Sequence, residues 1–235
     1  MTDPALEVRP DTLIGVTGTP DRALVTPWGD VTALSAAEPS TVSWYVAAED
    51  RWHQPAQEPA VRQRRLDGTP VVETRVRIPD GDAVQRVWSV PELGGLTVIE
   101  VENDSPLPFA VAFAGPRLLT ERPPADVPIR GLDLPAGSIV LPVGHRSSVR
   151  VAVPHDSSRV ATWALPALAP AMAVVRGWST LVNRASRVVM PDAGLADALT
   201  ASRCDLLLEG PGVADDPGGV LRDVADLARR GDDDD

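Results

Sequence analysis

The residues best suited to contact a ligand lie in one short stretch, SWYVAAEDRWHQ, at positions 43–54. It contains Trp44, Tyr45, Trp52 and His53, although only 4% of the whole chain is aromatic. Indole rings can stack on the apolar C–H faces of sugars, and neighbouring carboxylate and amide groups can bond sugar hydroxyls. These four residues are therefore candidate carbohydrate-binding residues.

A strand over the same stretch has a simpler interpretation. Because side chains alternate along a strand, Trp44 would face a protein core while Tyr45 points outward. Trp52 would then cover the loop that follows. This interpretation assigns the aromatic residues to packing, and we favour it on the alternation alone.

Other groups that could do chemistry do not form a recognisable site. His145 and His155 lack the spacing of metal ligands, and VPHDSS at 153–158 is typical of a turn. Glu100 and Glu102 share one face of an expected strand, which is the usual solvent face of an antiparallel sheet. The signatures G-x-S-x-G, P-loop and G-x-G-x-x-G are missing from the sequence. We therefore assign no catalytic residue, metal ligand or cofactor.

Composition excludes several classes of partner. The chain has 235 residues and a formal net charge of −11, and its 22 basic residues are all arginine. The densest basic cluster, VRQRRLDG at 61–68, is short and has acidic flanks, so a nucleic-acid surface is not expected. No run of 18 apolar residues occurs, which argues against a membrane span. Neither a secretion signal nor a pair of cysteines is evident, so a cytoplasmic location is expected.

The first 168 residues have the pattern of an antiparallel β-sandwich. The segments 71–78 and 83–90 alternate around the turn sequence PDGD, which predicts a β-hairpin. The segments 96–103 and 109–115 follow, so we expect four strands in meander order. Further strands are expected at 137–144, 147–154 and 159–166, and two or three more before residue 50. About eight to ten short strands at regular turn spacing are typical of two packed sheets.

Helical periodicity begins after Pro170. One helix is expected over 171–186, with Met172, Val175, Trp178, Leu181 and Val182 on a single face and Gly177 as its weak point. A second should start at Pro191 and end before Gly210, with a stripe of Leu195, Leu199, Ser202 and Leu206. A third is expected over 220–231. The domain prediction is thus a sandwich over 1–168, a helical segment over 169–230 and an acidic disordered tail over 231–235.

The order of these elements resembles a known family. The phrase VIEVENDSPLPFAVAFAG at 98–115, followed by RGWSTLVNRASRVVMPDAGLADALTASRCDLLLEG at 176–210, resembles the N-terminal region of six-hairpin glycosidases, the glucoamylase-like and glycogen-debranching-like enzymes. The resemblance implies a sandwich that precedes a helical barrel. In that family two glutamates on barrel loops hydrolyse the glycosidic bond. No residue of this chain matches either glutamate, so no catalytic role is transferred.

The sequence thus predicts a mainly β protein that acts as a non-catalytic module, structural or carbohydrate-associated. One alternative is a glycoside hydrolase whose catalytic barrel is missing or supplied by a partner. The other is a protein-interaction domain without affinity for sugar. The expected partners are a carbohydrate or a helical domain of another protein, and an uncovered helical stripe would favour a homo-oligomer.

Overall fold

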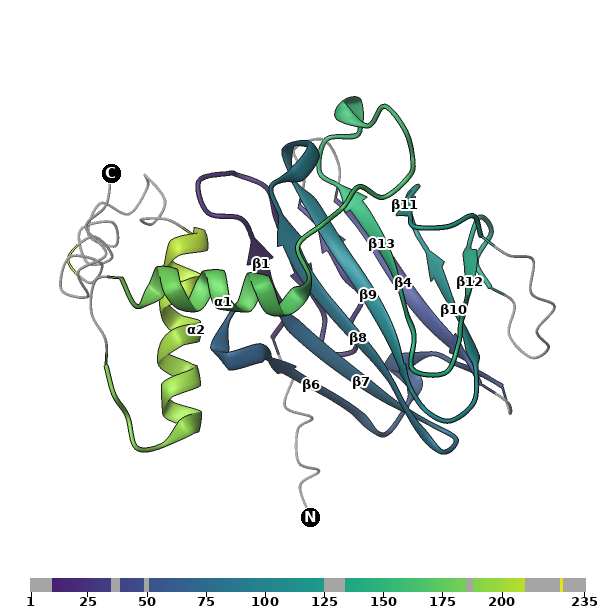
Figure 1. Cartoon of the computed structure of the whole chain (residues 1–235), viewed down its shortest axis with the longest axis horizontal. Helices are drawn as coiled ribbons and strands as arrows, with labels where there is room; N and C mark the ends of the chain where they lie inside the picture. Colours follow the sequence, from purple (N-terminus) through teal and green to yellow (C-terminus); the bar gives the residue numbers. More distant parts are fainter. Residues whose placement is uncertain are drawn as a thin grey trace, which may run out of the picture.

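The computed structural model describes residues 10–34, 39–48, 51–124, 134–184, 188–209 and residue 225. Two antiparallel sheets face each other, and two α-helices lie together at one end of them (Figure 1). The predicted class, a mainly β sandwich followed by a short helical segment, is confirmed.

The first sheet has seven strands in the order β1-β2-β3-β4-β10-β12, and β5 also pairs with β4. All of its pairings are antiparallel. Its strands are β1 (Thr12–Gly15), β2 (Arg22–Val25), β3 (Val31–Ala33), β4 (Ser40–Ala47), β5 (Trp52–His53), β10 (Phe109–Ala114) and β12 (Ile139–Val143).

The second sheet has six strands in the order β11-β13-β9-β8-β7-β6. They are β6 (Val61–Arg65), β7 (Val72–Ile78), β8 (Gly81–Val90), β9 (Leu96–Asp104), β11 (Leu119–Thr120) and β13 (Ser148–Pro154). The described residues also form four short 3-10 helices, which lie between strands or after them: η1 (Pro55–Gln57), η2 (Leu66–Gly68), η3 (Glu92–Gly94) and η4 (Ser157–Arg159).

The predicted hairpin is confirmed in β7 and β8. Their register joins Ile78 to Gly81 and Val72 to Val87. The two-residue turn between them uses a positive φ of 59° at Asp80, a conformation that aspartate tolerates better than most residues.

Two predictions about strand order were wrong. The segment after β9 does not continue the meander, because β10 lies in the other sheet, between β4 and β12. Pro106 and Pro108 in the connection lack the N–H groups that a sheet ladder needs, and Asn103 bonds the carbonyls of Leu107 and Val143, which fixes the crossing. The segment 159–166 forms no strand either; it makes a single bridge, between Thr120 and Ala164.

The main core fills the space between the sheets. Valine dominates it, together with a few larger side chains that are almost fully buried, among them Trp44, Phe113, Ile14 and Leu141. β-Branched residues suit a pleated surface, which is why so many short strands can stack here.

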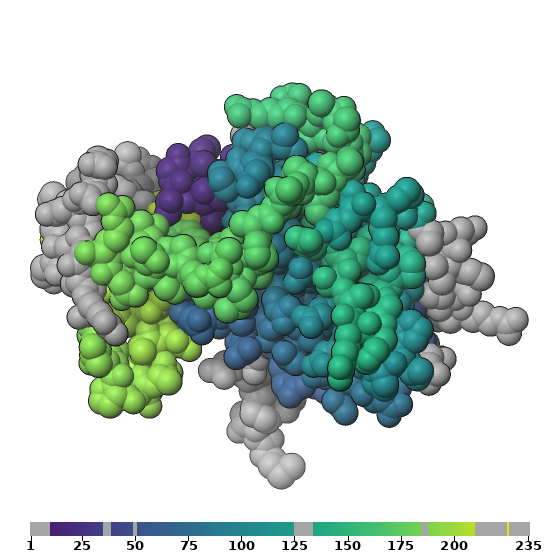
Figure 2. Space-filling view, viewed as in Figure 1, coloured from purple at the N-terminus to yellow at the C-terminus, as the bar shows by residue number. Residues whose placement is uncertain are grey.

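The outer face of the six-stranded sheet is divided into an apolar and a charged part. Helix α1 (Ala171–Val182) and the segment before it lie over the apolar part, where Ala171 and Val175 pack on Trp88 and Val98 (Figures 1 and 2). Beside it runs a row of directly paired residues with alternating charge: Arg64, Glu73, Arg86, Glu100 and Arg150.

The two helices pack on each other and on the sandwich. Trp178 and Val182 of α1 form one cluster with Cys204 and Leu208 of α2 (Ala193–Glu209). The expected face of α1 is confirmed for Val175, Trp178 and Val182, which are buried, whereas Met172 is exposed. Trp178 therefore joins α1 to α2 and to the β1 edge of the sandwich.

The predicted stripe of α2 was wrong. Leu195 is 57% exposed and Ser202 is exposed, while the buried residues are Arg203, Cys204 and Leu208. Docking on η2 selects this face: Gly68, at φ +70°, lies so close to α2 that a Cβ would come within 2.3 Å of the Asp197 carbonyl oxygen. Arg65 and Asp205 add an ion pair of 2.7 Å across the same contact.

The predicted third helix over 220–231 and the acidic tail over 231–235 lie outside the described residues, apart from helical Ala225. Among the residues that are described, no helix combines the length and hydropathy of a membrane span.

Cys204 provides a direct test of how α2 docks. It is fully buried, and burial raises the pKa of its thiol to about 12. Because only the thiolate attacks disulfide reagents, we expect the folded protein to react with 5,5′-dithiobis(2-nitrobenzoate) at pH 8 roughly a hundredfold more slowly than the chain in guanidinium chloride. Equal rates in the two conditions would show that α2 does not stay docked.

Candidate functional site

The four aromatic and imidazole side chains predicted to bind carbohydrate are all buried. Trp44, Tyr45, Trp52 and His53 are between 1% and 7% exposed. Trp44 faces the main core, and its indole nitrogen donates to the carbonyl of Trp28 at 2.9 Å. The alternation that favoured a packing role for Trp44 agrees with this placement.

The other three predicted residues lie together on strands β4 and β5. Tyr45 points to the outer face of its sheet, as expected, but it is covered there in a cluster that also contains Trp52. His53 Nδ1 lies 3.1 Å from Glu58 Oε1, and Arg51 donates to both oxygens of that carboxylate. None of these rings offers an open face for stacking, so sugar binding at this cluster stays a prediction that its burial does not favour.

The remaining histidines also have structural partners. His145 Nδ1 lies 2.7 Å from the Ser105 carbonyl oxygen, and His155 Nε2 lies 2.8 Å from Thr97 Oγ1. Within the described ranges, no group of three or more histidine, cysteine, aspartate or glutamate side chains could hold a metal ion.

A hollow that combines aromatic and charged groups lies elsewhere, around Trp163 in the segment between η4 and α1. The Arg117 guanidinium lies over the Trp163 indole, with its carbon 4.2 Å from the ring centroid. These two residues and Pro116 line two adjacent hollows, of about 710 and 400 Å³. We call the two hollows together the Trp163 cleft.

The chain builds this cleft from segments that are far apart in the sequence. Gly115 directly follows β10. It has a φ of +154° and no room for a Cβ, because the Thr41 carbonyl oxygen would lie 2.5 Å away. The turn after it places Arg117 at the rim. Trp163 follows η4, and the backbone of its segment bonds Thr120 at both Trp163 and Leu165. The indole is thus held by the edge strand β11 while part of it stays exposed.

Acidic and imidazole groups line the larger hollow beside this stacked pair. They are Asp21, His155 and Asp156. Asp156 accepts hydrogen bonds from the backbone and hydroxyl of Ser158 and from Arg159, and the bonds from Ser158 are the main reason that its pKa is lowered. It is therefore an ionised acceptor at neutral pH.

His155 is neutral at the same pH. Burial lowers its pKa, with Arg22 acting in the same direction and Asp21 against it. Its Nδ1 atom is buried and has no hydrogen-bond partner among the described residues. A neutral imidazole in the wall adds no second positive charge to the hollow.

This arrangement can bind a hydroxylated molecule. Arg117 forms no ion pair with a described carboxylate, so its N–H groups can donate to a ligand, while Asp21 and Asp156 can accept from hydroxyls. A volume of about 710 Å³ lies in the range of small-molecule sites. The part of the Trp163 indole that stays exposed supplies the apolar contact that a sugar ring requires.

Sequence reasoning placed Trp163 in the expected strand over 159–166 and did not consider Arg117 or Asp21 as site residues. The alternation in RVATWALP at 159–166 suggested that strand. Its flanking prolines, Pro154 and Pro166, were the available signal that this segment is a loop. Arg117 had a similar signal, because it directly follows the turn sequence Gly-Pro.

No similarity to a known protein helps to assign a function to this cleft. Comparisons with models of protein families, with curated proteins and with solved structures found no match.

Proposed function

We propose that the chain is a non-catalytic β-sandwich module that binds carbohydrate in the Trp163 cleft. The observation that carries the proposal is the Arg117–Trp163 stack, which lines two adjacent hollows and has the carboxylates of Asp21 and Asp156 in the larger one. Aromatic surface next to planar charged groups suits the alternating apolar and hydroxyl surfaces of a sugar.

Two adjacent hollows favour an oligosaccharide over a single sugar. A chain of sugar units could contact Asp21 and Asp156 on one side of the stacked pair and Thr120 on the other. Binding along such a groove depends on many modest contacts, so we expect weak affinity that rises with the length of the oligosaccharide.

The resemblance to the N-terminal region of six-hairpin glycosidases supports the same proposal. It rests on the order of elements, a sandwich followed by α1 and α2, and on the phrases at 98–115 and 176–210. In this proposal the module holds or orients a carbohydrate, and hydrolysis belongs to another domain or protein.

The experiment is calorimetric titration of the purified chain with maltopentaose, cellopentaose and xylopentaose. We expect one of these probes to bind, and Trp163→Ala to weaken its binding about tenfold, because the stacked surface is lost. Trp28→Ala is the matched control, since Trp28 is 41% exposed and does not line the cleft.

Four outcomes would contradict the proposal. If none of the three probes binds, or if both variants weaken binding equally, the cleft is not a sugar site. If Trp52→Ala abolishes binding while Trp163→Ala leaves it unchanged, the site is the aromatic cluster at 44–53. Release of reducing sugar by the purified chain would show that it is itself a glycosidase.

A further inference from the structure

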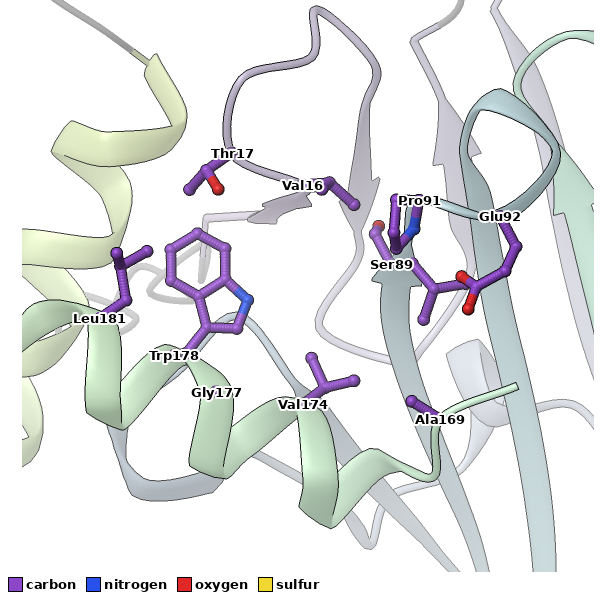
Figure 3. A pocket seen from close by; sticks show the side chains of 12 residues that line it. Val16, Thr17, Ser89, Pro91, Glu92, Ala169, Val174, Gly177, Trp178 and Leu181 are labelled. Atoms are coloured by element: carbon purple, nitrogen blue, oxygen red, sulfur yellow. The ribbon is translucent and has the colours of Figure 1, made fainter. Parts of the chain in front are cut away.

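A hollow apart from the Trp163 cleft, which we call the helix pocket, lies between α1 and one end of the sandwich. Its volume is about 370 Å³. Val174 and Trp178 of α1 form one side, Val16 and Thr17 after β1 lie opposite, and the end of β8 closes it (Figure 3). It shares no residue with the Trp163 cleft.

The walls of this pocket are mostly apolar, and α1 leaves room in them. Gly177 lies on the wall in the middle of α1, and a Cβ there would meet no atom within 4 Å. Glycine is less favourable than alanine in the interior of a helix, so this position loses helix stability without avoiding a clash. Its absent side chain contributes to the open space.

Two residues that line this pocket carry polar atoms without partners. Ser89 is more than nine-tenths buried, and its Oγ forms no hydrogen bond with a described residue. The Oε2 atom of Glu92 is also buried and unpartnered. A buried acceptor that loses water without gaining a hydrogen bond is costly, so two of them beside one pocket point to a ligand that satisfies them.

We propose that the helix pocket binds a small organic cation, a molecule with a compact apolar body and one protonated amine. The ammonium group would donate to Glu92 Oε2 and Ser89 Oγ, and the apolar body would lie against Val174 and the indole of Trp178. The carboxylate selects a cation over an anion, and the aromatic face of Trp178 favours the same charge. This site is independent of the carbohydrate proposal.

Three probes of similar shape and different charge test the proposal: 2-phenylethylamine, 2-phenylethanol and phenylacetate. Calorimetric titration of the full chain at pH 7 should show 2-phenylethylamine binding about tenfold more tightly than 2-phenylethanol, because only the amine forms a charge-assisted bond. Phenylacetate should bind most weakly of the three.

Matched variants locate the binding. Glu92→Gln keeps the shape of the side chain and removes its charge, so it should remove the preference for the amine and leave 2-phenylethanol unchanged. Gly177→Leu should abolish binding of all three probes by filling the space, and Leu181→Phe, on the same wall, serves if that variant does not fold. Asp104→Asn, an exposed carboxylate at the far end of β9, should change nothing.

The proposal is overturned if 2-phenylethylamine fails to bind, or if the alcohol or the acid binds as tightly. It is also overturned if Gly177→Leu, folded by circular dichroism, still binds the amine, because the probe then lies elsewhere. Loss of oligosaccharide binding in the Trp163→Ala variant would have no bearing on these results, so the two proposals fail separately.

Discussion

Replacing Trp44 with alanine is expected to lower the free energy of unfolding by about 4 kcal/mol. The indole is 1% exposed and packs between the two sheets, so its loss removes apolar contacts and leaves a cavity that the surrounding valines cannot fill. The substitution also leaves the Trp28 carbonyl without its donor. Urea denaturation followed by circular dichroism measures the change.

Two further variants separate the causes of that loss. Trp44→Phe keeps most of the ring and removes the indole N–H, so it should cost clearly less than Trp44→Ala. Trp28→Ala removes an exposed side chain and should change the free energy by no more than about 0.5 kcal/mol. If Trp44→Ala cost as little as Trp28→Ala, Trp44 would not be a core residue, and a surface role in sugar binding would regain support.

The sequence was sufficient for some of the strands, of which β7 and β8 are the clearest. In β7 apolar residues recur on one face at Val72, Val76 and Ile78, and turn residues separate this strand from β8, so the hairpin follows from local rules. Trp44 followed from the same alternation. Such signals depend on residues that are neighbours in the chain.

The sheet to which a strand belongs is not a local property. The strand β10 alternates no differently whether it continues beside β9 or crosses to β4, and only the contacts of Asn103 and the two prolines decide between these arrangements. The Trp163 cleft was missed for the same reason. The cleft depends on the stacking of Arg117 on Trp163, two residues that are far apart in the sequence. No local sequence pattern predicts that contact.

The buried face of α2 was also beyond local prediction. Its apolar residues are spread around the helix, so several faces compete for burial. The position of η2 and the close approach at Gly68 decide in favour of Cys204 and Leu208. A helix without one dominant apolar face takes its orientation from its neighbours.

The charged row on the outer sheet gives the second large prediction. The carboxylate of Glu73 is almost fully buried, and it accepts hydrogen bonds from Arg64, Arg75 and Arg86 on three strands. Glu73→Gln keeps the volume and removes the charge, so we expect the free energy of unfolding to fall by about 2 kcal/mol at pH 7. The partial exposure of the arginines keeps the loss below that of a wholly buried pair.

Glu102→Gln is the matched control. Its carboxylate lies on the same face and is paired with Arg86, but it is well exposed, so its loss should cost less than about 1 kcal/mol. Equal losses in the two variants would mean that the burial of Glu73 contributes nothing to the strength of its contacts.

The pH dependence distinguishes a charge effect from a packing effect at Glu73. Burial alone would raise the pKa of this carboxyl, but the arginines outweigh burial and hold the pKa below its ordinary value of 4.5. The folded state therefore favours the carboxylate. Its stabilisation is complete above the unfolded pKa and is lost as the pH falls through the folded pKa.

Glutamine imitates the protonated carboxyl, so the wild type and Glu73→Gln should differ most above about pH 5 and converge as the pH falls below 4.5. Urea denaturation of both proteins between pH 3 and 7 measures this difference in the free energy of unfolding. The other carboxyls titrate in both proteins, so their contributions nearly cancel in the comparison. A difference that stays constant over the whole range would assign the loss to packing around the amide. The alternating row would then hold its five strands together by shape and not by charge.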